Sequence, residues 1–195
     1  MLDTYGRKYV NPLIDLGAKL FSKLNLKPNH ITVLALLLGV ISSILIYFDK
    51  MILAIIMLWI SGYLDSVDGA MARMNGISSS WGTLLDITFD RIVELGIILV
   101  LAFKFPESRL SLLFLTMTIL ISMTIFLTVG ALAKNNGVKS FRYQAGVAER
   151  SEGFIFFSLM ILFSTSHLNI LTNLFSVIIL ITILQRILEA KRLLS

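Results

Sequence analysis

The sequence predicts an all-α integral membrane protein with six transmembrane helices and an N-terminal amphipathic helix on the membrane surface. Hydrophobic residues make up 56% of its 195 residues, and the mean hydropathy is +0.86. Charged residues make up only 15%, whereas an average soluble domain has about 25%. Apolar runs of the length that crosses a bilayer, about 20 residues, also recur along the whole chain.

Six apolar stretches are expected to span the membrane. The second stretch turns polar after Leu64 but contains no proline, so it can continue as helix to Arg73. In the third stretch the polar end comes first, near Gly82. The expected spans are residues 31–48, 51–73, 82–103, 110–133, 151–166 and 169–188.

A segment with apolar residues at helical spacing, residues 11–24, precedes the first span. Lys19 and Lys23 lie off its apolar stripe, which is typical of a helix on a membrane surface. Packing of the same stripe against the helix bundle explains the pattern equally well. We expect residues 1–195 to form a single membrane domain, in which residues 1–28 are the amphipathic segment and residues 29–195 the six-helix bundle.

Basic residues predict the orientation of the spans. Only three of the 17 lysines and arginines, namely Lys50, Lys104 and Arg109, fall in the loops on one side. The positive-inside rule therefore places the other side, with both termini, in the cytoplasm of a cell membrane. The net charge of +5 then reflects lysines and arginines that meet membrane lipids, so nucleic-acid binding is not expected. Because the chain has no cysteine, disulfides, thiolate metal sites and cysteine nucleophiles are excluded.

Four aspartates lie at the cytoplasmic ends of the second and third spans. Asp65 and Asp68 are three residues apart and Asp86 and Asp90 are four apart, so each pair shares one face of its helix. Four uncompensated carboxylates would repel one another, and oxygen ligands at this density suit Mg²⁺, Mn²⁺ or Ca²⁺. Two such ions could clamp a phosphate or a pyrophosphate. The forked guanidinium of Arg73 is suited to the same phosphate oxygens.

Two other interpretations of the aspartates are open. The first is a solvated interfacial loop in which the charges fall in pairs by coincidence, although ionisable groups between spans are usually functional. The second is a divalent-cation transporter, which needs carboxylates near the membrane centre and along a path across it. The four aspartates cluster at the cytoplasmic ends only, which favours a site for a phosphate-bearing ligand.

The pattern Asp65-x2-Asp68-Gly69-x2-Ala72-Arg73-x8-Gly82-x3-Asp86-x3-Asp90 resembles, without a gap, the signature of the CDP-alcohol phosphatidyltransferase family. Eight fixed positions match at one starting point with a chance probability on the order of 10⁻¹⁰, at about one in twenty per residue. The stretches "SSSWGTLLDITFDR" and "GVAERSEG" resemble the phosphatidylinositol-phosphate synthase branch. "KSF" followed by tyrosine is similar to uncharacterised bacterial members of the family.

The resemblance implies an enzyme that moves a phosphatidyl group from CDP-diacylglycerol to the hydroxyl of a small polar alcohol and releases CMP. It implies two Mg²⁺ or Mn²⁺ ions, direct displacement, and a homodimer. The metal ligands would be Asp65, Asp68, Asp86 and Asp90. Asp86 and Asp90 would be catalytic, with Asp90 also the base that deprotonates the acceptor hydroxyl.

The same resemblance assigns a nucleotide-binding set around the signature. It comprises Gly69, Ala72, Arg73 and Gly82, with Asn29 and Thr32 at the border of the nucleotide. Asn29 or Thr32 could equally be the cap of the first spanning helix. A reaction of CDP-choline or CDP-ethanolamine with diacylglycerol uses the same signature and is the alternative within the enzyme class.

The acceptor alcohol is left open. A phosphorylated acceptor would suit the cations of residues 134–153, although juxtamembrane contacts with anionic lipids explain the same cations. The acceptor-binding candidates are Lys134, Lys139, Arg142, Glu149 and Arg150. Glu94, one turn past Asp90, either pairs with Arg91, Arg150 or a neighbouring helix or lines the acceptor pocket.

Overall fold

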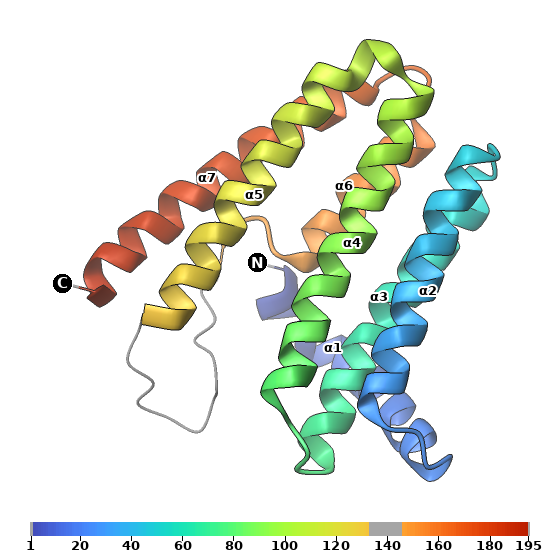
Figure 1. Cartoon of the computed structure of the whole chain (residues 1–195), viewed down its shortest axis with the longest axis vertical. Helices are drawn as coiled ribbons and strands as arrows, with labels where there is room; N and C mark the ends of the chain where they lie inside the picture. Colours follow the sequence, from blue (N-terminus) through green and yellow to red (C-terminus); the bar gives the residue numbers. More distant parts are fainter. Residues whose placement is uncertain (1, 133–145, 195) are drawn as a thin grey trace. The chain divides into compact units, whose positions relative to one another are not determined.

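The computed structural model describes residues 2–132 and 146–194, and these residues are almost entirely helical (Figure 1). Helix accounts for 87% of the structure, and the described residues contain no strand. The all-α prediction is therefore confirmed. The elements are α1 (Leu2–Lys23), α2 (Pro28–Tyr47), α3 (Met51–Met74), α4 (Ser80–Lys104), a 3₁₀ turn η1 (Pro106–Ser108), α5 (Arg109–Leu132), α6 (Arg150–Leu162) and α7 (Leu168–Leu194).

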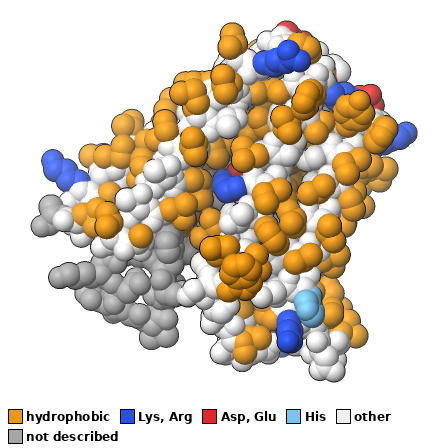
Figure 2. Space-filling view, viewed as in Figure 1, with side chains coloured by type: hydrophobic (Ala, Val, Ile, Leu, Met, Phe, Trp, Pro, Cys, Tyr) orange, Lys and Arg blue, Asp and Glu red, His pale blue; other side chains and the backbone are white. Residues whose placement is uncertain are grey.

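Within residues 2–132 and 146–194, four helices are long and apolar enough to cross a membrane, namely α2, α3, α5 together with η1, and α7. The other two predicted spans coincide with α4 and α6, which do not meet that criterion. α4 carries four charged residues within nine positions, from Asp86 to Glu94. α6 has 13 residues, which is about 20 Å of helix against a hydrocarbon core of about 30 Å. Hydrophobic side chains nevertheless dominate the face of the molecule in Figure 2.

The helices form two compact units, Tyr5–Lys104 and Phe105–Ser195 with Met1–Thr4. In the first unit, α2 and α3 run side by side as a helical hairpin (Figure 1). Two serines hydrogen-bond across this hairpin: Ser42 Oγ donates to the Ala54 carbonyl at 2.8 Å, and Ser61 Oγ donates to the Ala35 carbonyl at 2.7 Å. Such bonds between helices contribute to pairing in a membrane, where apolar contact alone gives little preference over lipid.

Small residues let α4 approach α2 closely. A Cβ added to Gly39 on α2 would lie 2.3 Å from Val93 Cγ2 on α4, which is closer than real Cβ atoms come. A Cβ added to Gly96 on α4 would lie 3.0 Å from Ser43 Oγ on α2. Glycine at these positions therefore determines how closely α4, the helix of Asp86, can pack.

One side of α1 packs on the helices of the first unit. Ala18 is fully buried, and Ile14 and Phe21 pack in the same cluster, which also holds Ile31 of α2 and Val67 of α3. Two residues of the predicted apolar stripe, Ile14 and Phe21, therefore pack against the helix bundle. The other four residues of the stripe are exposed instead, namely Leu13, Leu16 and Leu20 of α1 and Leu24 directly after it. Contact of these exposed residues with a membrane surface stays a prediction.

In the second unit, a buried arginine joins α5 to α7. Arg186 is 9% exposed, and its Nη1 donates to the Ser122 carbonyl at 3.0 Å and to Ser122 Oγ at 2.9 Å. Its guanidinium carbon lies 5.0 Å from the ring centroid of Phe126. α6 packs on α7 through stacked rings of Phe156 and Phe175, whose centroids are 4.7 Å apart. The buried charge of Arg186 is tolerated because Ser122 and Phe126 of α5 are its partners.

Candidate active site

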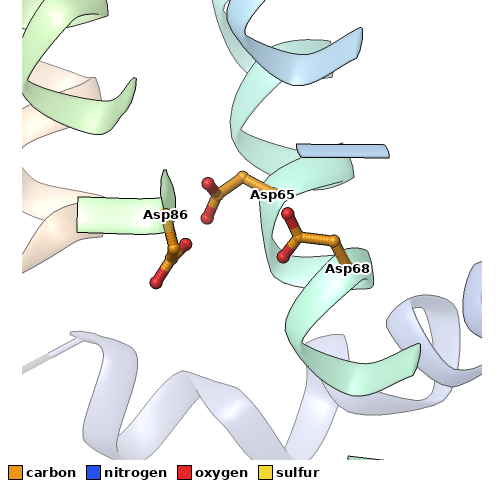
Figure 3. A group of neighbouring side chains, drawn as sticks. All are labelled: Asp65, Asp68 and Asp86. Atoms are coloured by element: carbon orange, nitrogen blue, oxygen red, sulfur yellow. The ribbon is translucent and has the colours of Figure 1, made fainter. Parts of the chain in front are cut away.

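Three of the four predicted aspartates come together within the first unit (Figure 3). Asp65 and Asp68 project from α3 toward Asp86 on α4. Each residue offers a carboxylate oxygen, and these oxygens all lie within 4.8 Å of one another. Asp65 is 6% exposed and Asp68 is 4% exposed, while Asp86 is half-buried. The i, i+3 spacing on α3 turns its two carboxylates to one side, and the packing of α4 brings the third to them.

These residues fit a divalent cation. Buried carboxylates at this separation cost free energy through desolvation and mutual repulsion, unless positive charge compensates them. The donor set of the cluster contains only carboxylate oxygens, which is the set that hard ions such as Mg²⁺ and Mn²⁺ prefer. Asp90 follows Asp86 by one turn on α4 and is half-buried. Among the described residues, the cluster within 4.8 Å consists of Asp65, Asp68 and Asp86 and does not include Asp90.

Arg73 lies beside Gly69, the first glycine of the signature. A Cβ added to Gly69 would lie 3.2 Å from Arg73 Nη1, so the guanidinium occupies the space that a larger residue at position 69 would need. Arg73 is exposed and Gly69 and Ala72 are half-buried at the same end of α3. The end of α3 therefore offers a forked cation above a surface made of small side chains.

The structure brings Asn29 next to the second signature glycine. A Cβ added to Gly82 would lie 3.5 Å from Asn29 Oδ1 and 3.2 Å from Ser79 Oγ. The Gly82 N–H donates to Ser79 Oγ at 3.0 Å. Ser79 was not predicted as a site residue, although a serine directly before a helix is a common cap. The starts of α2 and α4 thus meet at a glycine, more than 50 residues apart in sequence.

Thr32 uses its hydroxyl within its own helix. Its Oγ1 donates to the Pro28 carbonyl at 3.1 Å, and the residue is 4% exposed. The interpretation of Asn29 or Thr32 as the helix cap is wrong, because α2 begins at Pro28 with Lys27 as the N-cap residue. Proline suits the first turn, where a backbone N–H has no partner in the helix.

Glu94 pairs with Arg91, one of the partners that the sequence allowed. Arg91 Nη1 donates to Glu94 Oε2, and Arg91 Nη2 donates to Glu94 Oε1 at 2.7 Å. The two side chains are 28% and 19% exposed. This two-bond pair neutralises both charges along α4, directly after Asp90.

Two of the five acceptor-binding candidates can be located. Glu149 is the N-cap residue of α6 and forms a capping box with Glu152, whose Oε2 accepts from the Glu149 N–H at 3.2 Å. Arg150 opens α6, with its guanidinium carbon 5.7 Å from the ring centroid of Phe154. The other three, Lys134, Lys139 and Arg142, lie outside the described residues.

Residues 25–187 match the family model of CDP-alcohol phosphatidyltransferase. The chain belongs to the CDP-alcohol phosphatidyltransferase family. It is therefore an enzyme of lipid synthesis, and the predicted family and enzyme class are confirmed. Membership of the family, together with four helices of spanning length, indicates a membrane protein.

Curated members of the family resemble the chain over most of its length. It is 31% identical to the archaetidylinositol phosphate synthase of Pyrococcus horikoshii over 192 residues, which are 98% of this chain and 97% of that protein. It is 30% identical to the phosphatidylinositol phosphate synthase of Corynebacterium glutamicum over 162 residues, which are 80% of this chain and 71% of that protein.

The fold is also that of a solved member, the phosphatidylinositol phosphate synthase of Mycobacterium tuberculosis. Its crystal structure with CDP-DAG bound matches with a TM-score of 0.72 at 23% identity, covering 92% of this chain and 94% of that one. A second crystal structure, in complex with manganese and citrate, matches with the same TM-score of 0.72 over 89% and 87% of the two chains. At this identity the likeness supports the fold alone.

Proposed function

We propose that this family member transfers a phosphatidyl group from CDP-diacylglycerol to the hydroxyl of a small polar alcohol and releases CMP. The observation that carries the proposal is the convergence of Asp65, Asp68 and Asp86 from two helices within 4.8 Å. The acceptor oxygen forms a bond to the phosphorus on the lipid side of the pyrophosphate. The bond from that phosphorus to the oxygen of CMP breaks, and the acceptor proton passes to a base.

The residues of the signature divide this work. Asp65, Asp68, Asp86 and Asp90 would hold two divalent ions. When bound, Mg²⁺ or Mn²⁺ would supply positive charge to the pyrophosphate and to the departing CMP. Asp90 accepts the proton of the acceptor hydroxyl, because a hydroxyl is a weak nucleophile until a base or a metal activates it.

The nucleotide is held at the ends of α2, α3 and α4 in this proposal. Arg73 binds phosphate oxygens with its forked donors. Small side chains leave room for the cytidine, and the α2 residues border it. The proposed nucleotide-binding residues are Asn29, Thr32, Gly69, Ala72, Arg73 and Gly82.

For the acceptor we propose an inositol phosphate, because two relatives that cover most of the chain are named for inositol phosphate lipids. A phosphate monoester would be recognised by guanidinium and ammonium groups. The proposed acceptor-binding residues are Lys134, Lys139, Arg142, Glu149 and Arg150.

The membrane arrangement is part of the same proposal. Residues 1–195 form a single transferase domain with six spanning segments, namely α2, α3, α4, α5, α7 and the shorter α6 together with the turns that follow it. Both termini and the aspartates lie in the cytoplasm, as the distribution of basic residues favours. The exposed leucines of α1 lie on the membrane surface. The enzyme is a homodimer, as the family resemblance implies.

An acceptor panel tests the function. Purified protein in nanodiscs receives CDP-diacylglycerol, Mg²⁺ and one of serine, glycerol 3-phosphate, inositol, inositol 1-phosphate, choline or ethanolamine. We expect CMP release and labelled lipid product with inositol 1-phosphate and with at most one further alcohol. Product from CDP-choline and diacylglycerol would instead reverse the roles of the substrates. Metal flux into vesicles without CMP release from any pair would contradict the enzyme and indicate a transporter.

Removal of divalent ions is expected to stop the reaction. EDTA treatment should lower CMP release to background, because the aspartates would then face the pyrophosphate without compensating charge. Addition of Mg²⁺ or Mn²⁺ in excess over EDTA should restore the rate, while Na⁺ at the same ionic strength should not. Undiminished CMP release in EDTA, with metal content verified by mass spectrometry, would contradict the metal site.

A further inference from the structure

The segment directly before α6 is held by α7 through side chains instead of backbone pairing. The Ala148 N–H donates to Thr182 Oγ1 at 2.9 Å, and the Val147 N–H donates to Gln185 Oε1 at 3.2 Å. The next N–H, that of Glu149, donates to the Glu152 side chain at 3.2 Å. Three consecutive backbone donors are thus satisfied by side chains, and two of these side chains belong to one face of α7.

The contact with Thr182 is close and oriented. Thr182 is 1% exposed, and its hydroxyl donates to the Ile178 carbonyl at 3.1 Å, which leaves its lone pairs for the Ala148 N–H. Gly146 is buried against the same residue: an added Cβ would lie 2.4 Å from Thr182 Cγ2. A larger residue at position 146 would therefore require the segment or the Thr182 side chain to shift.

The anchoring of this segment to α7 also affects the position of Arg150, the first residue of α6. The segment 146–149 has no regular structure of its own, and α6 starts at Arg150 with Glu149 as its N-cap. A displacement of Val147 or Ala148 would therefore move Arg150 relative to α7, although Thr182 and Gln185 do not belong to the predicted acceptor-binding set.

We propose that Thr182 and Gln185 of α7 are positioning residues for the acceptor alcohol, which act by holding segment 146–149 and hence Arg150. This inference rests on the proposed function. It assigns to α7 a role in acceptor affinity, while the affinity for the CDP-linked donor depends on residues of the first unit.

Substitution of Thr182 separates these two affinities. Thr182→Val keeps the shape of the side chain but removes the acceptor of the Ala148 N–H. With CDP-diacylglycerol as donor and inositol 1-phosphate as acceptor, we expect the acceptor KM to rise about five- to tenfold, the size expected for a lost buried hydrogen bond. The donor KM should stay within about twofold, since the donor residues are untouched. Thr182→Ser, which keeps the hydroxyl, should restore the acceptor KM.

A compensating pair tests the contact itself. Gly146→Ala should raise the acceptor KM, because its Cβ meets Thr182 Cγ2. In the double variant Gly146→Ala/Thr182→Ser that methyl group is absent, so the KM should return to within about threefold of the wild-type value. A double variant as impaired as Gly146→Ala alone would overturn the proposed contact.

Amide hydrogen exchange in nanodiscs provides a readout that does not depend on turnover. The amides of Val147 and Ala148 should exchange faster in Thr182→Val than in wild type and Thr182→Ser. Unchanged exchange, or equal changes in the donor and acceptor KM, would refute the positioning role. If another alcohol of the panel proves to be the acceptor, the same KM comparison applies to it. If the wild-type protein uses no alcohol of the panel, the proposed function fails. The exchange rates of the Val147 and Ala148 amides then test separately whether Thr182 holds this segment.

Discussion

Asp86→Asn is expected to reduce CMP release by about 10²- to 10³-fold or more, the scale of losing one charged group that stabilises a transition state. Asparagine has nearly the same size as aspartate, so the packing of α4 against α2 should be retained. The substitution removes the negative charge of the one carboxylate that α4 contributes to the cluster of Asp65, Asp68 and Asp86. Asp68→Ala, on the facing helix, should have the same effect on turnover.

Metal-dependent thermal stability distinguishes a lost ligand from a damaged fold. A ligand that binds the folded state raises its stability, so Mn²⁺ should raise the melting temperature of the wild-type protein. Asp86→Asn should melt at a similar temperature without Mn²⁺ and gain much less from its addition. Asp15→Asn is the matched control, because Asp15 is an exposed aspartate on α1. Turnover at the wild-type rate in Asp86→Asn or Asp68→Ala would show that the assigned site is wrong.

Gly39→Ala is expected to lower both stability and activity. The added Cβ would lie 2.3 Å from Val93 Cγ2 and 2.7 Å from Val93 Cγ1, and a β-branched side chain has little freedom to turn away. α4 must then shift from α2, at a cost of about 1–3 kcal/mol for an overpacked contact. The melting temperature should fall by several degrees, measured from the monodisperse fraction that survives heating in detergent. CMP release should fall as well, because Asp86 is carried by the displaced helix.

The double variant Gly39→Ala/Val93→Ala provides the control for this contact. Val93→Ala alone removes two methyl groups and leaves a small cavity, which is also destabilising. In the double variant the new methyl group of residue 39 occupies that space, so the combined loss should be smaller than the sum of the two single losses. Strictly additive losses would mean that the helices do not meet at Gly39 and Val93.

The polar ends of α3 and α4 could be predicted because helical spacing is local. Asp65 with Asp68, and Asp86 with Asp90, share a face whenever their segments are helical, and Arg91 with Glu94 likewise. The ends of the helices were predicted less accurately than the spacing within them. The segment 151–166 was predicted as a span, yet α6 ends at Leu162. The predicted cap of α2 was also wrong, because α2 begins at Pro28 and its N-cap residue is Lys27.

The chain's own residues determined that it is helical and apolar, that its carboxylates come in pairs, and which family signature they form. The helical and apolar character and the pairing of the carboxylates depend on neighbours within about two helical turns, and the signature is one continuous stretch of sequence, residues 65–90. Only the tertiary structure decided that Asn29 lies at Gly82, that Val93 faces Gly39, and that Thr182 holds Ala148. These contacts join residues 34 or more positions apart, and the choice among many apolar helix faces depends on which small side chains allow two backbones to approach. No periodicity within one helix contains that information.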